Sequence, residues 1–237
     1  SLGKTWDRIF LKFNRTLGNW ILKKSDKITV YSKSIKIRNA EVIPSGIRPH
    51  KIKKTDNYFR NKFKNKKIIT FIGLINPRKG INTLIKIAKK TDAIFLVIGD
   101  NPTNKKIVKN YKKISPKNMI YLGRRKDIHN ILSQTDIFIF PSRGEGLPGV
   151  IFEAMLHGLP IIASNIPCID EQIDHRLGGF LVNKDDSNEF TKRIKEISNK
   201  KLAKKMGKHN QEKIKKFYWK NLEEKYQKLY NVRNNGI

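Results

Sequence analysis

The sequence contains a single cysteine, Cys168, among 237 residues. One cysteine can form neither an internal disulfide nor a zinc site built from several cysteines. The chain also lacks an unbroken apolar run of the ~20 residues that a membrane-spanning helix needs. Its first ten residues, SLGKTWDRIF, lack the apolar block of a secretory signal. With 38% hydrophobic and 30% charged residues, we expect a folded protein of the reducing cytoplasm.

Acidic residues are scarce. The chain carries 51 Lys and Arg against 20 Asp and Glu, a formal net charge of +31. The excess lies on the flanks, because residues 1–66 contain 18 basic and 4 acidic groups and residues 187–237 contain 15 and 5. A basic surface attracts the phosphates of nucleic acid or of anionic lipid. A composition rich in Lys, Asn and Ile explains the same excess without any partner.

Strand and helix patterns alternate through the middle of the chain. Short apolar runs typical of buried strands lie at 68–73, 93–100, 118–123, 136–142, 159–164 and 179–182. Helical patterns lie at 81–90, 104–114, 127–134, 150–158, 187–198 and over most of 201–231. Such alternation predicts an α/β fold with a doubly wound, Rossmann-like parallel sheet covered on both faces. Ligands of these sheets bind beyond the carboxyl ends of the strands.

The first 66 residues do not follow this alternation. Apolar residues recur at helical spacing from Trp6 to Ile21, accompanied by basic residues. We favour a helix that packs on a neighbouring domain over one that lies on a membrane surface. Two short strands are expected at 27–34 and 40–47, and the residues that follow, to 66, read as a charged linker.

Two carboxylates stand out in the stretch from residue 141 to 164. Glu145 lies in a Gly- and Pro-rich loop after a strand, and Glu153 lies in the helix that follows. From the rise of a helix per residue, the two carboxylates are on the order of 10 Å apart. The two catalytic carboxylates of a glycosidase are ~5 Å apart in retaining enzymes and at most ~9.5 Å apart in inverting ones. This spacing suits two hydroxyl-binding points on one elongated ligand. The helix N-terminus between them suits a phosphate.

Two other functions compete with this interpretation. Gly144 to Gly149 formally match G-x-G-x-x-G, with Asp170 about 20 residues further on, which would indicate a dinucleotide-binding oxidoreductase. That fingerprint belongs on the first strand of a sheet, however, and here it follows the fourth. The charge and the aromatic residues among the flanking lysines would suit a nucleic-acid- or membrane-surface-binding protein, but no nucleic-acid motif is present.

The segment EGLPGVIFEAM resembles the E-x7-E signature of the family 4 (group 1) glycosyltransferases. Other segments resemble that family in the same order, from residue 25 to residue 231: SDKITVYS, VIPSGI, FIGLINPRKG, IYLGRRKD, DIFIFPSRGEGLP, GGFLV and FYWKNLEEKYQKLY. Each segment alone is weak evidence, but the ordered set is specific.

The resemblance implies the GT-B fold, of which this chain would hold mainly the C-terminal half. Residues 1–47 would be the remnant of an N-terminal acceptor domain, 48–66 a linker, 67–216 the nucleotide-sugar-binding domain and 217–237 a helix crossing back. The implied activity is transfer of a sugar, with retention, from a UDP- or GDP-linked donor to a glycan or lipid-linked acceptor. It implies no required metal, since the Lys plays the part of the cation. From the missing motif, the single cysteine and the basic flanks, we expect no nucleic-acid partner and a cytoplasmic location, peripheral on the inner face of the membrane.

The resemblance also assigns residues. Glu145 would contact hydroxyls of the donor sugar, Lys79 would neutralise the diphosphate, and Glu153 would hold the ribose. The first loop would approach the donor at Gly73, the base would be bordered by Gly123 and Arg124, and the sugar and phosphate would be lined by Gly146, Leu147, Pro148 and Gly149.

One position departs from the family pattern. Many members carry Arg directly after the first-loop glycine, and this Arg pairs with the Lys on the diphosphate. Here that position is Leu74, and Arg78, beside Lys79, is the candidate substitute.

Overall fold

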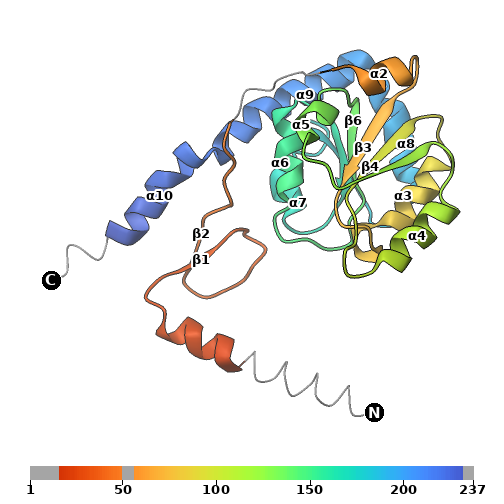
Figure 1. Cartoon of the computed structure of the whole chain (residues 1–237). Helices are drawn as coiled ribbons and strands as arrows, with labels where there is room; N and C mark the ends of the chain where they lie inside the picture. Colours follow the sequence, from red (N-terminus) through yellow and green to blue (C-terminus); the bar gives the residue numbers. More distant parts are fainter. Residues whose placement is uncertain (1–15, 50–55, 232–237) are drawn as a thin grey trace, which may run out of the picture.

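The core of the protein is one six-stranded parallel sheet. The computed structural model describes residues 16–49 and 56–231 (Figure 1). The strands lie in the order β5-β4-β3-β6-β7-β8. Their bounds are β3 (Ile68–Ile72), β4 (Ile94–Ile98), β5 (Met119–Gly123), β6 (Ile137–Phe140), β7 (Ile161–Ser164) and β8 (Gly179–Val182). The predicted doubly wound parallel sheet is confirmed.

The central strands are apolar throughout because both faces of the sheet are covered. Every residue of β3, β6 and β7 is buried. Helices on one side of the sheet are α3 (Ile81–Ala88), α4 (Lys105–Ile114) and α8 (Ser187–Ile197), and on the other α5 (Ile128–Leu132), α6 (Gly149–Leu156) and α7 (Ile169–Gln172) (Figure 1). The predicted apolar stripe of α3, with Ile81 and Leu84 fully buried, faces this core.

The chain reverses its direction across the sheet between β3 and β6. From β3 it proceeds outward through β4 to β5, then returns to β6, which pairs directly with β3, and proceeds the other way to β8. The space beyond the carboxyl ends of β3 and β6, which we call the crevice, is the usual ligand site of doubly wound sheets with such a reversal. The loops leaving these two strands carry Lys79 and Glu145.

Part of the expected linker is instead built into the domain. Helix α2 (Tyr58–Lys62) buries Phe59, whose backbone N–H donates to Gln134 Oε1 at 2.8 Å. The Arg60 guanidinium pairs with Asp136 at 2.8 Å. Within the expected linker of 48–66, residues 58–62 therefore form a short helix held against the domain by one buried aromatic side chain and two polar contacts. Residues 50–55 lie outside the described part.

The C-terminal helical stretch is broken in two. Helix α9 (Lys200–Ile214) leads into a 3-10 turn, η2 (Lys215–Phe217), and helix α10 (Trp219–Asn231) follows. The break has a tertiary cause. The Ile47 N–H donates to Phe217 O at 2.8 Å, and the Trp219 N–H donates to Ile47 O at 3.2 Å. Pairing with the distant Ile47 holds Tyr218 in an extended conformation, which the helical periodicity alone could not reveal.

The N-terminal segment stands beside the main domain (Figure 1). Residues 16–24 are helical, and β1 (Ile28–Val30) pairs in parallel with β2 (Ala40–Val42). Leu17, Trp20 and Ile21 are 43%, 58% and 50% exposed. Packing of this helix on a neighbouring domain is thus not found among the described residues. The first half of the expected helix, from Trp6 to Phe13, lies outside them.

No helix within residues 16–49 and 56–231 is long and apolar enough to cross a membrane.

Candidate functional site

Lys79 and Glu145 meet at the crevice between the ends of β3 and β6. Lys79 Nζ lies 2.8 Å and 2.7 Å from the two carboxylate oxygens of Glu145. The Glu145 side chain is 9% exposed and that of Lys79 is 23% exposed. The Ser142 hydroxyl donates a short hydrogen bond to Glu145 Oε1. This largely buried ion pair offers a cation to the phosphate groups of a ligand and a carboxylate to its hydroxyl groups.

Local backbone structure explains how Lys79 reaches this position. It ends a 3-10 turn, η1 (Pro77–Lys79), in which Asn76 Oδ1 accepts the Lys79 N–H at 2.9 Å. Gly80 follows with φ +74°, and a Cβ there would lie 1.9 Å from the carbonyl oxygen of Pro141. Only glycine allows the first loop to touch the β6 loop so closely.

Further hydrogen bonds join the same two loops. The Arg143 N–H donates to Arg78 O at 2.8 Å, and Arg78 Nε donates to Gly144 O at 3.0 Å. Arg78 therefore lies over the loop that carries Glu145, while its guanidinium stays exposed. Leu74, at the position of the usual arginine, is 42% exposed.

Arg143 is committed elsewhere. Its Nε donates to Asp185 Oδ1 at 3.0 Å, and the Thr83 hydroxyl donates to the same oxygen at 2.8 Å. Burial raises the pKa of Asp185, but these two hydrogen bonds outweigh it and hold the pKa below its ordinary value. Arg143 thus anchors the loop rather than adding to the free charge of the site.

The N-terminus of α6 adds backbone donors beside this pair. Pro148 is the N-cap residue and makes no side-chain cap. Within the described residues, no acceptor is found for the backbone N–H groups of Gly146, Leu147 and Gly149. Unpaired N–H groups at the positive end of a helix dipole favour an anion. The predicted donor loop therefore has the chemistry of a phosphate site.

Glu153 lies one turn inside α6. It is half-buried, between the buried side chains of Phe152 and Ala154. This environment matches the apolar context from which the sequence singled it out.

A hollow of about 300 Å³ opens at the ends of β3, β4 and β5. It brings together the predicted residues Gly73 and Arg124, with Leu74 on its wall. Gly123 ends β5 with φ +67° and accepts a hydrogen bond from the Gly99 N–H at 2.8 Å. Asp100, Pro102, Arg125 and Ile128 also line it. The first three belong to loops after strand ends, where the sequence places ligand contacts, but none of the four was assigned a role from the sequence.

Tyr31 also reaches the donor loop, and sequence reasoning missed it. It comes from the N-terminal segment, and a Cβ on Gly146 would lie 2.8 Å from its hydroxyl oxygen. No local pattern marks this tyrosine, because its position depends on how two distant segments meet.

The described residues contain no group of three or more His, Cys, Asp and Glu side chains placed to hold a metal ion. Asp185 and Asp186 are adjacent in the sequence and resemble a metal-binding pair. Asp186 instead caps α8, because its side chain accepts the Glu189 N–H at 3.0 Å.

Comparison with known proteins shows which family shares this sequence. Residues 53–213 match the family model described as Glycosyl transferases group 1. An Escherichia coli protein named UDP-Gal:alpha-D-GlcNAc-diphosphoundecaprenol alpha-1,3-galactosyltransferase is 30% identical over 183 residues, which are 71% of this chain and 47% of that protein. An uncharacterised glycosyltransferase of Methanocaldococcus jannaschii is 29% identical over 219 residues, covering 86% of this chain and 60% of that protein. The chain thus spans about half the length of such relatives.

Solved structures share the fold. Anabaena HepE, solved in complex with UDP and glucose, is 20% identical with a TM-score of 0.80, covering 93% of this chain and 66% of that chain. A glycosyltransferase of Rickettsia africae is 19% identical with a TM-score of 0.83, covering 95% and 68%. With two thirds of its length matched by the family model and its sheet superposing on such structures, this chain belongs to the group 1 glycosyltransferases.

Proposed function

We propose that this chain supplies the donor site of a retaining glycosyltransferase, which moves a sugar from a nucleotide sugar to a glycan or lipid-linked acceptor. The observation that carries the proposal is the Lys79–Glu145 pair, at 2.7 Å, at the reversal point of the sheet and beside the N-terminus of α6. This place offers a cation and backbone N–H groups for a diphosphate, and a carboxylate for sugar hydroxyls.

The proposed roles follow from these chemistries. In the reaction, an acceptor oxygen bonds to the anomeric carbon, the bond from that carbon to the diphosphate oxygen breaks, and the acceptor proton is released. Lys79 and the backbone N–H groups of Gly146, Leu147 and Gly149 stabilise the negative charge that grows on the leaving diphosphate. Because Lys79 plays the part of a cation, the proposal needs no metal.

Glu145 accepts hydrogen bonds from hydroxyls of the donor sugar and holds it in place for attack. Glu153 accepts hydrogen bonds from the ribose hydroxyls. The hollow bordered by Gly73 and Arg124 takes the base. The solved complexes of Anabaena HepE with UDP and with UDP-glucose support a uridine donor as the first candidate.

Arg78 is proposed to replace the arginine that is absent at Leu74. Its backbone and side chain are both tied to the β6 loop, and it directly precedes Lys79. Its Nε therefore lies at the carbonyl oxygen of Gly144, the residue before Glu145.

We further propose the domain roles implied by the family. Residues 1–47 belong to the acceptor side, residues 67–216 bind the donor, and residues 217–237 tie the two sides together. The last role is supported by the packing of α10, whose Leu222 is 1% exposed, and by the contact of Trp219 with Gly46.

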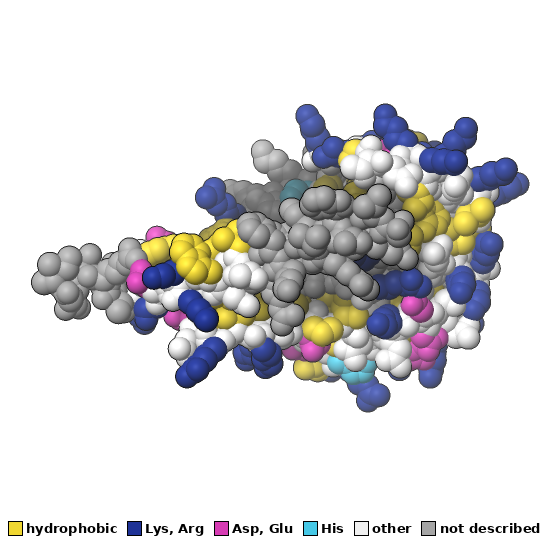
Figure 2. Space-filling model, turned by 90° about the horizontal axis from the view of Figure 1, so that it is seen from below, with side chains coloured by type: hydrophobic (Ala, Val, Ile, Leu, Met, Phe, Trp, Pro, Cys, Tyr) yellow, Lys and Arg dark blue, Asp and Glu magenta, His cyan; other side chains and the backbone are white. Residues whose placement is uncertain are grey.

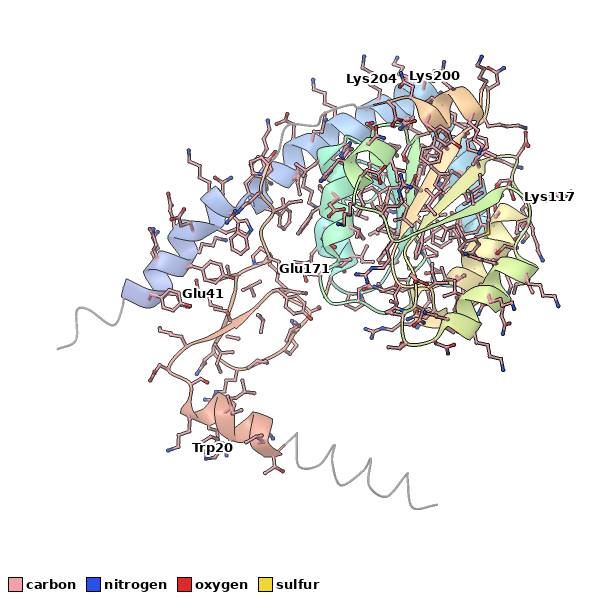
Figure 3. All side chains as sticks on the ribbon, in the orientation of Figure 1. Trp20, Glu41, Lys117, Glu171, Lys200 and Lys204 are labelled. Carbon is pink, nitrogen blue, oxygen red and sulfur yellow. The ribbon has the colours of Figure 1, made fainter. Side chains whose placement is uncertain are left out.

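A location on the cytoplasmic face of an anionic membrane is proposed from the basic surface. Lys and Arg side chains project around the molecule in the view of Figure 2. Lys200 and Lys204 of α9 point away from the sheet (Figure 3) and are exposed. Pelleting with vesicles that contain phosphatidylserine, at low and high salt, tests this proposal, because a surface held by charge is released by salt.

The donor role is tested by thermal shift with UDP, GDP, ADP, UDP-glucose, GDP-mannose, NAD and a short DNA. A ligand at 100 times its dissociation constant stabilises the protein by ~2.7 kcal/mol. We expect one sugar nucleotide to raise the melting temperature, and Glu153→Ala to abolish the shift. Glu224→Ala, on the exposed face of α10, is the matched control and should keep it. A response to NAD alone, or to DNA alone, would overturn the proposal.

A further inference from the structure

The phenol of Tyr31 lies against the donor loop. A Cβ placed on Gly146 would meet Tyr31 Oη at 2.8 Å and its Cζ at 3.2 Å. Gly146 directly follows Glu145, so the hydroxyl of Tyr31 is presented to the part of the loop that bears the carboxylate. Tyr31 is 39% exposed, so a ligand in the crevice can reach it.

A carboxylate on α7 fixes the segment that carries this phenol. Glu171 accepts hydrogen bonds from the Ser32 hydroxyl at 2.5 Å, from the Lys33 N–H at 3.2 Å and from the Ser34 N–H at 3.3 Å. Burial raises the pKa of Glu171, but these donors outweigh it and lower the pKa below its ordinary value. In Figure 3 Glu171 stands between the N-terminal segment and the main domain.

The same helix also holds the donor loop. Gln172, the next residue, is fully buried and donates from Nε2 to Pro148 O at 3.2 Å. At the start of the helix, Cys168 Sγ lies 3.0 Å from the Ser34 hydroxyl. Glu171 therefore holds the residues that directly follow Tyr31, and its neighbour Gln172 holds the loop that contains Gly146. One short helix thus ties the two segments together beside the phenol.

We propose that Tyr31 binds the sugar part of the donor, and that Glu171 is the positioning residue that holds Tyr31 in place. A phenol both donates and accepts hydrogen bonds, which suits a sugar hydroxyl. Its neighbour Glu145 accepts only, so the two groups together would read two hydroxyls of one sugar ring. The inference rests on the proposed function, because Gly146 lines a sugar only if the crevice binds a nucleotide sugar.

The test compares a nucleotide with its own sugar conjugate. Titration calorimetry measures the Kd of UDP and of UDP-glucose for the full chain, with GDP and GDP-mannose as the second pair. One hydrogen bond to a neutral hydroxyl corresponds to about three- to tenfold in Kd. We expect Tyr31→Phe to raise the Kd of the sugar nucleotide by about that factor and to leave the Kd of the free nucleotide within about twofold.

Glu171→Gln should cause the same selective loss, because a neutral amide holds the Ser32–Ser34 segment less firmly. Two matched controls should cause none. Asp170→Asn makes the same charge change in the same turn of α7, at an exposed residue, and Tyr230→Phe removes a hydroxyl from a tyrosine that is 68% exposed. Unchanged melting temperatures show that each variant folds.

Each outcome decides one point. Equal losses for nucleotide and sugar nucleotide, or no loss with Tyr31→Phe, overturn the sugar contact. A loss with Tyr31→Phe but none with Glu171→Gln overturns the positioning role. A wild-type chain that binds no nucleotide of either pair overturns the proposed function itself, and the inference falls with it.

Discussion

Replacing Gly80 by alanine should separate the two loops that bring Lys79 to Glu145. Gly80 has φ +74°, and a Cβ built on it would lie 1.9 Å from the carbonyl oxygen of Pro141 and 2.6 Å from the carbonyl carbon. These neighbours are backbone atoms of a buried strand end, so they cannot swing aside as a flexible side chain would. The η1 turn must move away, and Lys79, the preceding residue, must move with it.

The expected loss of stability in Gly80→Ala has two parts. Placing a Cβ residue in the left-handed region costs ~1–2 kcal/mol. Forcing extra atoms into a packed contact costs a further ~1–3 kcal/mol. Gly80→Ala should therefore lower the free energy of unfolding by about 2–5 kcal/mol. Gly123→Ala is the matched control, because Gly123 has φ +67° with nothing within 4 Å of its would-be Cβ. It should lose only the first part, about 1–2 kcal/mol.

Urea unfolding of the two variants and the wild type measures both losses directly. A loss of 1 kcal/mol lowers the melting temperature by about 2–4 °C in a domain of this size, so thermal melts give an independent check. UDP titration should also show weaker binding in Gly80→Ala. Equal losses of stability in the two variants would refute the reasoning, since the close approach to Pro141 would then contribute nothing.

Three further predictions concern the site and its support. Glu145→Gln should leave UDP affinity equal or a fewfold tighter, because it frees Lys79 for phosphate, while sugar transfer or sugar-nucleotide binding falls at least about tenfold; weaker UDP binding would contradict this. Asn210→Ala should cost about 2–4 kcal/mol in urea unfolding, because its buried amide donates at 2.8 Å and 2.7 Å to two carbonyl oxygens, and a smaller loss than that of an exposed Asn would count against it. His175 accepts the Leu181 N–H at 3.0 Å, and burial, with two nearby arginines, lowers its pKa below 6.5. Its contribution to stability is therefore complete above about pH 6.5 and declines as the pH falls toward the lowered pKa. His175→Asn should then reduce the difference between the urea midpoints at about pH 7.5 and about pH 5. An unchanged difference would show that His175 does not cause the loss of stability at low pH.

The sequence by itself determined the sheet, and it pointed to the charged residues of the proposed site. Apolar runs such as the one at 68–73 are long enough to be buried on both faces and too short for a helix, so their alternation with amphipathic helices left one architecture. Glu145 stood out because it follows a strand, at the edge where doubly wound sheets bind ligands. Lys79 was proposed from the resemblance to the glycosyltransferase family. The hydrophobic pattern and the direction of a strand depend on residues that are neighbours in the chain, so both can be read from the sequence.

Only the tertiary structure decided which distant groups meet. The ion pair of Lys79 with Glu145, at 2.7 Å, depends on the direct pairing of β3 with β6, and the backbone approach at Gly80 depends on the same pairing. The break of the C-terminal helix at Tyr218 depends on hydrogen bonds to Ile47, which lies about 170 residues earlier in the chain. Tyr31 lies against Gly146, and α7 is hydrogen-bonded to both segments. Such contacts are fixed by packing between elements far apart in sequence, and no local propensity encodes them.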